Sequence, residues 1–291
     1  MPGRGTAASF AAPPPARLLH DTLFMSLRIA TWNVNSLRQR LDHLARFSAE
    51  AAPDVICLQE TKVTDEEFPQ DAVREMGYPH LLIHGQKGYN GVAILSRVAF
   101  RSQDTNVWCG KDDRRHATVT LESGSGVIEL HNFYVPSGGA KPDPEANEKF
   151  AHKLQFLREM TEWAAETRLG TRAAILVGDL NVAPLETDVW NHKRLLNSVG
   201  HTPVESAHIA RLIEAGALID VGRHFVPASE PLYTWWGYRY PQAFAKNYGW
   251  RLDHVLATAP LKASLAGFRV VRDTRTWDRP SDHVPLVLDI G

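Results

Sequence analysis

The segment ILVGDLNVAP, residues 175–184, ends a run of apolar residues with Gly178, Asp179 and Asn181. The apolar run is typical of a buried strand. Asp and Asn are common turn residues because their side chains hydrogen-bond nearby backbone groups, so a simple turn is one interpretation. A polar site at the strand end is the other, because residues two apart in an extended chain point to the same side. Asp179 and Asn181 would then face one point.

Strands dominate the pattern around this segment, and helices fall between some of them. Apolar, β-branched and aromatic runs predict strands at 28–34, 54–60, 79–85, 91–97, 116–122, 126–136, 173–178, 233–237, 251–258, 267–271 and 283–290. Helical spacing of apolar residues predicts helices after residue 36, from Phe150 to near Gly170, and from Ile209 to Leu218. Hairpins and crossovers coexist in this order, so we expect an α/β protein with mixed sheets.

The composition is that of an ordinary globular protein, with 44% apolar and 22% charged residues among 291. The formal net charge of −1 does not favour a nucleic-acid binder, although a local basic face would be enough for one. Cys57 and Cys109 form neither a disulfide framework nor a zinc-ligand spacing. Without a run long enough to span a membrane or an interior linker, residues 27–291 are predicted to form one domain.

Residues 1–26 differ from the rest of the chain. They are rich in Ala, Pro and Gly and predict a disordered tail, because little in them can pack. The segment lacks the apolar stretch of a secretory signal, and its prolines disfavour the amphipathic helix of an organelle transit peptide. Met25 directly precedes the first expected strand, which leaves open that residues 1–24 are an upstream start artefact.

Polar residues stand at the ends of several predicted strands. They are Asn33, Glu60, Asp179, Asn181, Asp253, Asp282 and His283. Taken singly, residues such as Asn33 or Asp282 are typical of a cap or turn, whereas Glu60 follows an apolar run and needs a partner or a cation. Four carboxylates brought together would repel one another without a cation. Oxygen ligands without clustered Cys or His favour Mg²⁺ or Mn²⁺ over zinc. Phosphodiester hydrolysis needs such a metal, a base for water and a donor to the phosphate oxygens.

A set of motifs occurs in order along the chain: TWNVNSLR, DVICLQETKV, HGQKGYNGVAILS, NFYVPSGG, GDLNVAP, YTWWGYR, RLDHVLA and SDHVPLV. Together they resemble the exonuclease III family of abasic-site endonucleases, within the endonuclease/exonuclease/phosphatase superfamily. The resemblance covers essentially 27–291. It implies a four-layer sandwich of two mixed sheets flanked by helices. The implied activities are cleavage 5′ to abasic sites, 3′→5′ exonuclease action on duplex DNA and removal of 3′ blocking groups.

The resemblance also implies a cofactor, partners and a location. Mg²⁺ is the implied cofactor, for which Mn²⁺ can substitute. Double-stranded DNA with abasic sites or 3′ ends is the implied partner. We expect a monomer that does not bind membranes, works in the cytoplasm as a bacterial nucleoid-associated enzyme, and is not secreted.

Roles follow only at positions that match the family motifs. The implied metal-site residues are Glu60 as principal ligand, Asp282, Asn33, Asp179 and Asn181. The implied catalytic residues are Asp179 on the attacking water, Asn181 and Tyr134 on the scissile phosphate, and His283 oriented by Asp253. A carboxylate on one ring nitrogen fixes the histidine tautomer and supports the charged ring. The choice of base between Asp179 and His283 stays open.

Candidate DNA contacts are less specific. Lys62, Arg114 and Arg115 are either phosphate contacts or solvated side chains. The segment 233–251 is dense in aromatic residues with basic residues between them, which suits a loop beside a damaged nucleotide, although sheet core is expected for half of its rings. Its candidates for DNA contact are Trp235, with Trp236 as the fallback, and Arg239 and Asn247. By strand period alone, Trp235 would instead pack in the core with Tyr233.

Ser137 departs from the resemblance, because relatives often carry Asn or Gln there. The shorter side chain leaves the balance between exonuclease and endonuclease action open. Two other functions were weighed. A phosphoesterase on small or lipid phosphates is disfavoured by WWGYR and QKGYNG and by the lack of a membrane-binding segment. A non-catalytic nucleic-acid-binding regulator is disfavoured because every family site position is filled.

Overall fold

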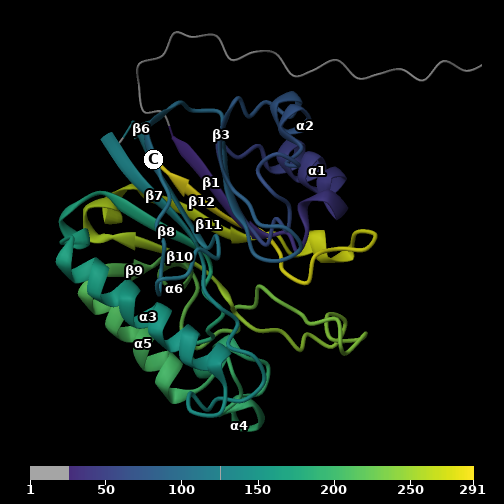
Figure 1. The fold of residues 1–291 in the computed structure, drawn as a ribbon, viewed down its shortest axis with the longest axis vertical. Helices are drawn as coiled ribbons and strands as arrows, with labels where there is room; N and C mark the ends of the chain where they lie inside the picture. The colour runs from purple at the N-terminus through teal and green to yellow at the C-terminus, as the bar shows by residue number, and fades with distance from the viewer. Residues whose placement is uncertain (1–25, 125) are drawn as a thin grey trace, which may run out of the picture.

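The computed structural model describes residues 26–124 and 126–291. Two sheets of six strands form its centre (Figure 1). The first sheet has the order β11-β12-β1-β2-β4-β3 and the second the order β5-β6-β7-β8-β10-β9. The first is built from β1 (Leu27–Asn33), β2 (Val55–Gln59), β3 (His80–His84), β4 (Val92–Ser96), β11 (Leu265–Val270) and β12 (Leu286–Ile290). The second is built from β5 (Phe100–Asp104), β6 (His116–Ser123), β7 (Gly126–Tyr134), β8 (Ala174–Asp179), β9 (Leu218–Asp220) and β10 (Asp253–Thr258).

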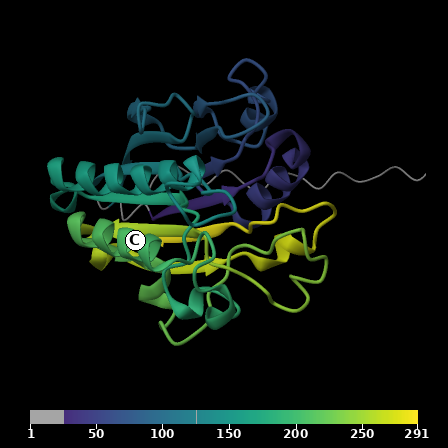
Figure 2. The same cartoon turned by 60° about the horizontal axis from the view of Figure 1, so that its bottom comes forward.

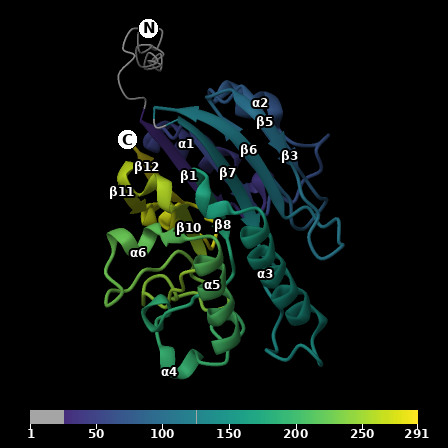
Figure 3. The same ribbon diagram turned by 90° about the vertical axis from the view of Figure 1, so that its left-hand side faces the viewer.

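Helices cover the outer faces of both sheets. On the first sheet lie α1 (Leu41–Ala51) and α2 (Gln70–Glu75), and on the second α3 (Glu148–Glu166) and α5 (Pro203–Ala215) run side by side (Figure 3). Shorter helical segments complete the described chain: α4 (His192–Leu195), α6 (Val221–Phe225), η1 (Leu37–Gln39), η2 (Leu169–Thr171), η3 (Glu186–Asp188), η4 (Ala259–Ser264) and η5 (Arg272–Thr276).

Three buried apolar clusters separate these layers. The largest lies between the sheets and takes Ile29 and Val55 from the first sheet and Val119 and Val177 from the second. A second cluster joins the first sheet to α1, and a third joins the second sheet to α3 and α5. The expected four-layer sandwich of two mixed sheets is therefore confirmed. The predicted tail at 1–26 lies outside the described residues except for Ser26.

Most expected strands are present, but the strand predicted at 233–237 is wrong. Trp235 makes isolated bridges to Trp250 and His283, and no residue of this segment belongs to a strand of either sheet. Its side chains do not alternate between the two faces of a sheet, as they would in a strand. The helix from Phe150 ends at Glu166 rather than near Gly170, and Leu218 begins β9 instead of closing α5.

Strand direction brings the predicted polar residues to one edge. β1 pairs parallel with β2, and β7 pairs parallel with β8, so the carboxyl ends of each pair lie together. β10 is antiparallel to β8, with Asp253 opposite Asp179, and β12 is antiparallel to β1. The loops at 230–250 and 272–283 project at the same end (Figure 2). Residues far apart in sequence therefore meet at this end of the sandwich.

Candidate active site

One amide links the two sheets at this edge. Asn33, the last residue of β1, donates its Nδ2 hydrogens to Oε1 of Glu60 and Oδ2 of Asp179, each at 2.9 Å. Its Oδ1 accepts from the backbone N–H of Asn35 at 3.0 Å. Asn33 and Asp179 are both buried, so their hydrogen bonds are shielded from water. The amide thus fixes the distance between a carboxylate of the first sheet and one of the second.

Glu60 sits directly after β2 in a left-handed conformation, with φ of 51°. The Tyr134 hydroxyl donates to its Oε1 at 2.8 Å, and Lys62 Nζ lies 2.7 Å from its Oε2. Burial acts to raise the pKa of Glu60, but the Lys62 ammonium and the Asn33 amide outweigh it and lower that pKa. Burial and the nearby carboxylates Glu60 and Asp179 raise the pKa of Tyr134 well above its usual range. Glu60 is therefore ionised and Tyr134 remains a hydrogen-bond donor at neutral pH.

His283 lies between two buried carboxylates. Its Nδ1 is 2.8 Å from Oδ2 of Asp253, and its Nε2 is 3.7 Å from Oδ2 of Asp179. Thr234 Oγ1 donates to the same Asp253 oxygen at 2.6 Å. Burial alone would lower the pKa of His283, but Asp253 and Asp179 raise it to about 10. The imidazole is therefore protonated at neutral pH, and Asp253 fixes its orientation.

Asp179 is the carboxylate with the most perturbed titration in this group. Burial raises its pKa to about 7, with Asp253 and Glu60 acting in the same direction and His283 and Asn33 against them. A carboxylate with this pKa is partly ionised at neutral pH and can both take and hold a proton.

The GDLN segment combines both interpretations that its sequence allows. Asn181 has φ of 54°, so the chain is not extended there, and the reasoning from alternating sides was wrong. Its backbone N–H donates to Oδ1 of Asp179 at 2.9 Å, which is a turn closed by an aspartate side chain. Its Nδ2 donates to the carbonyl of Val135 at 2.9 Å. Gly178, with φ of 132°, is required because a Cβ there would lie 1.9 Å from the Phe133 carbonyl oxygen. This turn places Asp179 and Asn181 at the site.

Asp282 belongs to a second group of contacts around Asn35, a residue that the sequence analysis missed. Asn35 Nδ2 donates to Oδ1 of Asp282 at 2.9 Å, and Asn35 Oδ1 accepts from Lys62 Nζ at 2.6 Å. Trp235 Nε1 donates to Oδ2 of Asp282 at 2.9 Å. Asn35 stands two residues after Asn33 in TWNVN, the same spacing as in GDLN, and that repeated pattern was the available signal.

The donor set fits a hard divalent cation. Oxygens of Glu60, Asp282 and Asn35 line the edge, and such oxygens are the ligands that Mg²⁺ and Mn²⁺ prefer, whereas Asn33 turns its Nδ2 to Glu60 and its Oδ1 to the Asn35 backbone. Asp179, Asp253 and His283 also hold ligand atoms within 4.8 Å of one another, but there the imidazole carries the positive charge. A divalent cation therefore fits better beside Glu60 and Asp282. Among the described residues, Lys62 is the only cationic side chain in contact with Glu60.

The candidate DNA-contacting residues are placed differently from one another. Arg115 lies over the Tyr134 ring at 4.8 Å, donates to the Tyr134 carbonyl at 3.3 Å and pairs with Asp113. Arg114 pairs with Asp112 and contacts His84. Both arginines are thus engaged by the protein, Arg115 beside the site.

The aromatic segment divides between core and cleft. Trp236 is completely buried and packs with Tyr233. It has no exposed surface that DNA could contact, so its prediction as a DNA contact is wrong. Trp235 is only half-buried and lies beside His283, with ring centroids 6.4 Å apart, so its expected core position by strand period was wrong. Asn247 is exposed, and its Oδ1 accepts from Trp236 Nε1 at 3.3 Å and Arg272 Nη2 at 3.0 Å. Arg239 is exposed in the same loop.

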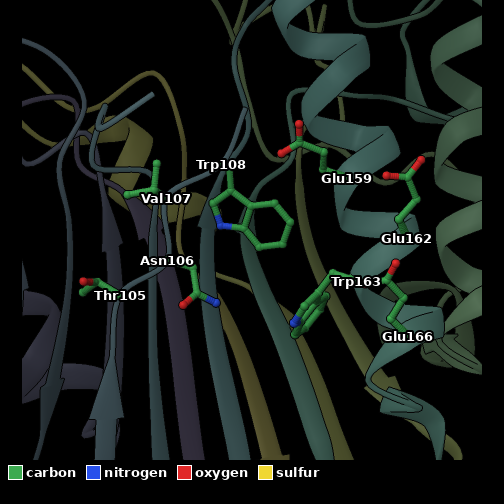
Figure 4. A pocket seen from close by; sticks show the side chains of 8 residues that line it. All are labelled: Thr105, Asn106, Val107, Trp108, Glu159, Glu162, Trp163 and Glu166. Carbon is green, nitrogen blue, oxygen red and sulfur yellow. The ribbon is translucent and has the colours of Figure 1, made fainter. Parts of the chain in front are cut away.

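Two hollows differ in charge. One of about 430 Å³ adjoins the site and is lined by Asn35, Ser36, Arg38, Gln39, Arg40, Lys62, Gly88 and Tyr238. The other, of about 450 Å³, lies between residues 105–108 and the second half of α3, where Glu159, Glu162 and Glu166 face it (Figure 4). The basic hollow suits a phosphate backbone, whereas the acidic one would repel it.

Comparison with known proteins agrees with this geometry. The profile of the endonuclease/exonuclease/phosphatase family matches residues 30–283. The chain belongs to this family. Exodeoxyribonuclease III of Haemophilus influenzae is 31% identical over 89% of this chain and 98% of its own length. Exodeoxyribonuclease of Bacillus subtilis is 30% identical over 91% of this chain and its full length. The expected membership of the exonuclease III group within this hydrolase family is therefore confirmed.

Solved structures place the fold in the same family. An AP endonuclease from Archaeoglobus fulgidus is 34% identical with a TM-score of 0.83, and covers 91% of this chain and 99% of its own. The 3′–5′ exonuclease from Neisseria meningitidis is 32% identical with a TM-score of 0.82 and the same coverage. A Neisseria 3′ phosphatase with the same identity and TM-score was solved bound to a product DNA hairpin. Within the described residues, no helix has the length and apolar character to cross a membrane.

Proposed function

We propose that this family member is a Mg²⁺-dependent DNA repair phosphodiesterase of the exodeoxyribonuclease III type. It incises duplex DNA 5′ to abasic sites, degrades 3′ ends and removes 3′ blocking groups. The observation that carries the proposal is the buried pair of Asp179 and His283, whose facing atoms are 3.7 Å apart and whose pKa values are both shifted upward. The names of the relatives support the choice of DNA as substrate.

Asp179 is the base in this proposal. A general base works best when its pKa lies near the working pH, and Asp179 with a pKa of about 7 meets that condition. His283 has a pKa of about 10 and is already protonated, so it has no free lone pair for a proton at neutral pH. Asp179 takes a proton from water, the water oxygen bonds to phosphorus, one P–O ester bond breaks, and the leaving oxygen takes up a proton from solvent to leave as an alcohol. We therefore propose Asp179 rather than His283 as the base.

The scissile phosphate is held by donors around Asp179. His283 Nε2 carries a proton and faces the Asp179 side of the site. Tyr134 supplies a hydroxyl that rests on Glu60, and the Asn181 side-chain amide, which gives one hydrogen to the Val135 carbonyl, has a second hydrogen for a phosphate oxygen. Preorganised donors of this kind stabilise charge that develops on phosphate oxygens in the transition state.

Glu60 and Asp282 would hold the magnesium ion, with Asn33 orienting Glu60 against Asp179. When bound, the ion polarises the phosphoryl oxygen and stabilises the leaving oxygen. Asn35 belongs to this set because its Nδ2 donates a hydrogen bond to Asp282 and its Oδ1 accepts one from Lys62. Mn²⁺ would substitute because it prefers the same oxygen ligands.

The DNA backbone would follow the basic hollow beside Lys62, Arg38 and Arg40. Trp235 would contact the nucleotide from beside His283, and Arg115, Arg239 and Asn247 are further candidates for backbone contact. We further propose a monomer, with one domain over 27–291, that works in the cytoplasm. Preference for abasic sites or 3′ ends is part of the same proposal.

The test uses duplex oligonucleotides with one tetrahydrofuran abasic analogue, or with a 3′ phosphate. The wild-type protein should incise 5′ to the analogue with Mg²⁺ and not with EDTA. Asp179→Asn should lower kcat by at least about 100-fold. Asp71→Asn on exposed α2 is the matched control and should retain activity. Resection of 3′ ends without incision would contradict the abasic preference alone, and binding without any turnover would contradict the enzyme.

A further inference from the structure

A buried ion pair behind the site joins α3 to α5. Lys153 Nζ lies 2.5 Å from Oε1 of Glu205, and neither side chain has exposed surface. No step proposed above uses either residue. Burying two charges costs several kcal/mol per ion unless hydrogen bonds complete both groups. The other partners of the pair therefore show what it holds in place.

The Lys153 ammonium reaches two loops beside the site: the loop that follows Tyr134 and the loop that carries Asn181. It donates to the carbonyl of Asn181 at 2.6 Å and to the carbonyl of Ser137 at 3.4 Å. With Glu205, these acceptors account for the three donors of an ammonium group. The loop after β7 and the loop after β8 are thus tied to one side chain. Gly138 lies against the same side chain, because a Cβ there would come within 2.9 Å of Lys153 Cδ.

Glu205 is itself held firmly. Its carboxylate accepts from the backbone N–H of Gly200 at 2.9 Å and from the N–H and hydroxyl of Thr202 at 3.1 and 2.7 Å. Thr202 and Glu205 form the capping box at the start of α5. The ammonium is therefore anchored to the N-terminal end of α5.

Asn181 needs such an anchor. A non-glycine residue at positive φ is strained and persists only where its surroundings hold it. We infer that Lys153 and Glu205 are positioning residues, which fix the Asn181 turn and the 135–138 loop relative to each other for phosphate binding. This inference rests on the proposed function of Asn181. It assigns a role in turnover to a pair that touches no substrate.

A thermodynamic cycle on the cleavage rate tests this role. Lys153→Met with Glu205→Leu replaces the pair by apolar side chains, since removing one partner alone leaves a buried charge unpaired. We expect kcat on the abasic duplex to fall about 10- to 100-fold with KM changed less than about threefold, because small misplacements of reacting groups cost rate. In an Asn181→Gly background, glycine adopts the positive φ without strain. There the same double substitution should lower kcat less than about threefold.

The matched control is Arg158→Met with Glu162→Leu, an exposed i,i+4 pair on the same helix, which should leave kcat unchanged. An equal loss of kcat in both backgrounds would overturn the inference, since a pair that only stabilises the fold does not couple to Asn181. If the apolar double variant does not fold, Glu205→Gln takes its place in the same cycle with the same criterion. An inactive wild-type protein would contradict the proposed function, whereas an active one with additive losses contradicts the positioning role alone.

Discussion

The Nδ1 atom of His283 lies 2.8 Å from the Oδ2 atom of Asp253, and the opposite ring nitrogen faces Asp179. One imidazolium is therefore enclosed between two carboxylates from neighbouring strands of the second sheet. This arrangement separates the two titrations of the site, because the histidine keeps its proton while Asp179 titrates near neutrality. The pH dependence of the reaction should report the arrangement directly.

Asp253→Asn should move the alkaline limit of activity to lower pH. Asp253 raises the pKa of His283, and the protonated ring is lost as pH rises through that pKa, which is about 10 in the native protein. In the variant this loss occurs at lower pH, and kcat at pH 8 should fall about 100-fold. The measurement is kcat from pH 6 to 10.5. An unchanged alkaline limb would show that His283 does not act as a cation.

Lys62→Met should tighten binding of a divalent cation. The Lys62 ammonium lies 2.7 Å from Glu60 Oε2 and opposes a second positive charge at that carboxylate. Its removal should lower the Kd for Mn²⁺ about three- to tenfold, measured by calorimetry with Asp179→Asn protein to prevent turnover. Lys262→Met is the matched control, because η4 follows the opposite end of β10. Weaker Mn²⁺ binding in Lys62→Met would place the metal elsewhere.

The two adjacent tryptophans should separate stability from activity. Trp236→Ala removes a completely buried ring and should lower the free energy of unfolding by about 3–5 kcal/mol. Trp235→Phe keeps a ring beside His283 but removes the donor to Asp282, so kcat/KM should fall about tenfold with little change in stability. Urea denaturation and steady-state kinetics measure both. Similar effects of the two changes would contradict the division between core and cleft.

Gly178→Ala should be severely destabilising. A Cβ at this residue would lie 1.9 Å from the Phe133 carbonyl oxygen, so β7 and β8 would have to separate. We expect a loss of about 3 kcal/mol or more in the free energy of unfolding. Gly77→Ala isolates the cost of positive φ, because nothing lies within 4 Å of the added Cβ, and should cost about 1 kcal/mol. Equal costs in the two variants would rule out the steric explanation.

Acid should destabilise the protein through buried neutral histidines. Burial lowers the pKa of His116 well below 6.5, and His131, 3.2 Å away, adds repulsion between protonated rings. The unfolded chain then binds the proton first, so stability is present above about pH 6.5 and is lost as pH falls below it. Each such histidine contributes a slope of about 1.4 kcal/mol per pH unit. His116→Phe should reduce the slope of unfolding free energy between pH 6.5 and 5, whereas His224→Gln on an exposed ring should not.

Much of the candidate site could be predicted because its residues mark the ends of strands. Glu60, Asp179 and Asp253 directly follow or begin apolar runs, where a carboxylate has no structural reason to stand without a partner. The reasoning failed for the segment 233–237. Its aromatic residues are typical of a strand, but its backbone hydrogen-bonds to Trp250 and Asp282 rather than joining either sheet, and its buried rings pack against Val284. Strand period therefore assigned Trp235 and Trp236 to the wrong sides.

The sequence by itself determined the mixed character of the sheets, the order of the polar strand ends and the oxygen-rich character of the site, because these follow from local apolar patterns and residue types. The arrangement as two sheets in four layers followed only from the family resemblance. Only the tertiary structure decided which groups meet. Strand register sets Asp253 opposite Asp179, the turn at Asn181 takes its positive φ, and Lys153 reaches that turn from α3. The strand register and the Lys153 contact join residues 28 or more positions apart, so long-range packing determines them and no local pattern records them.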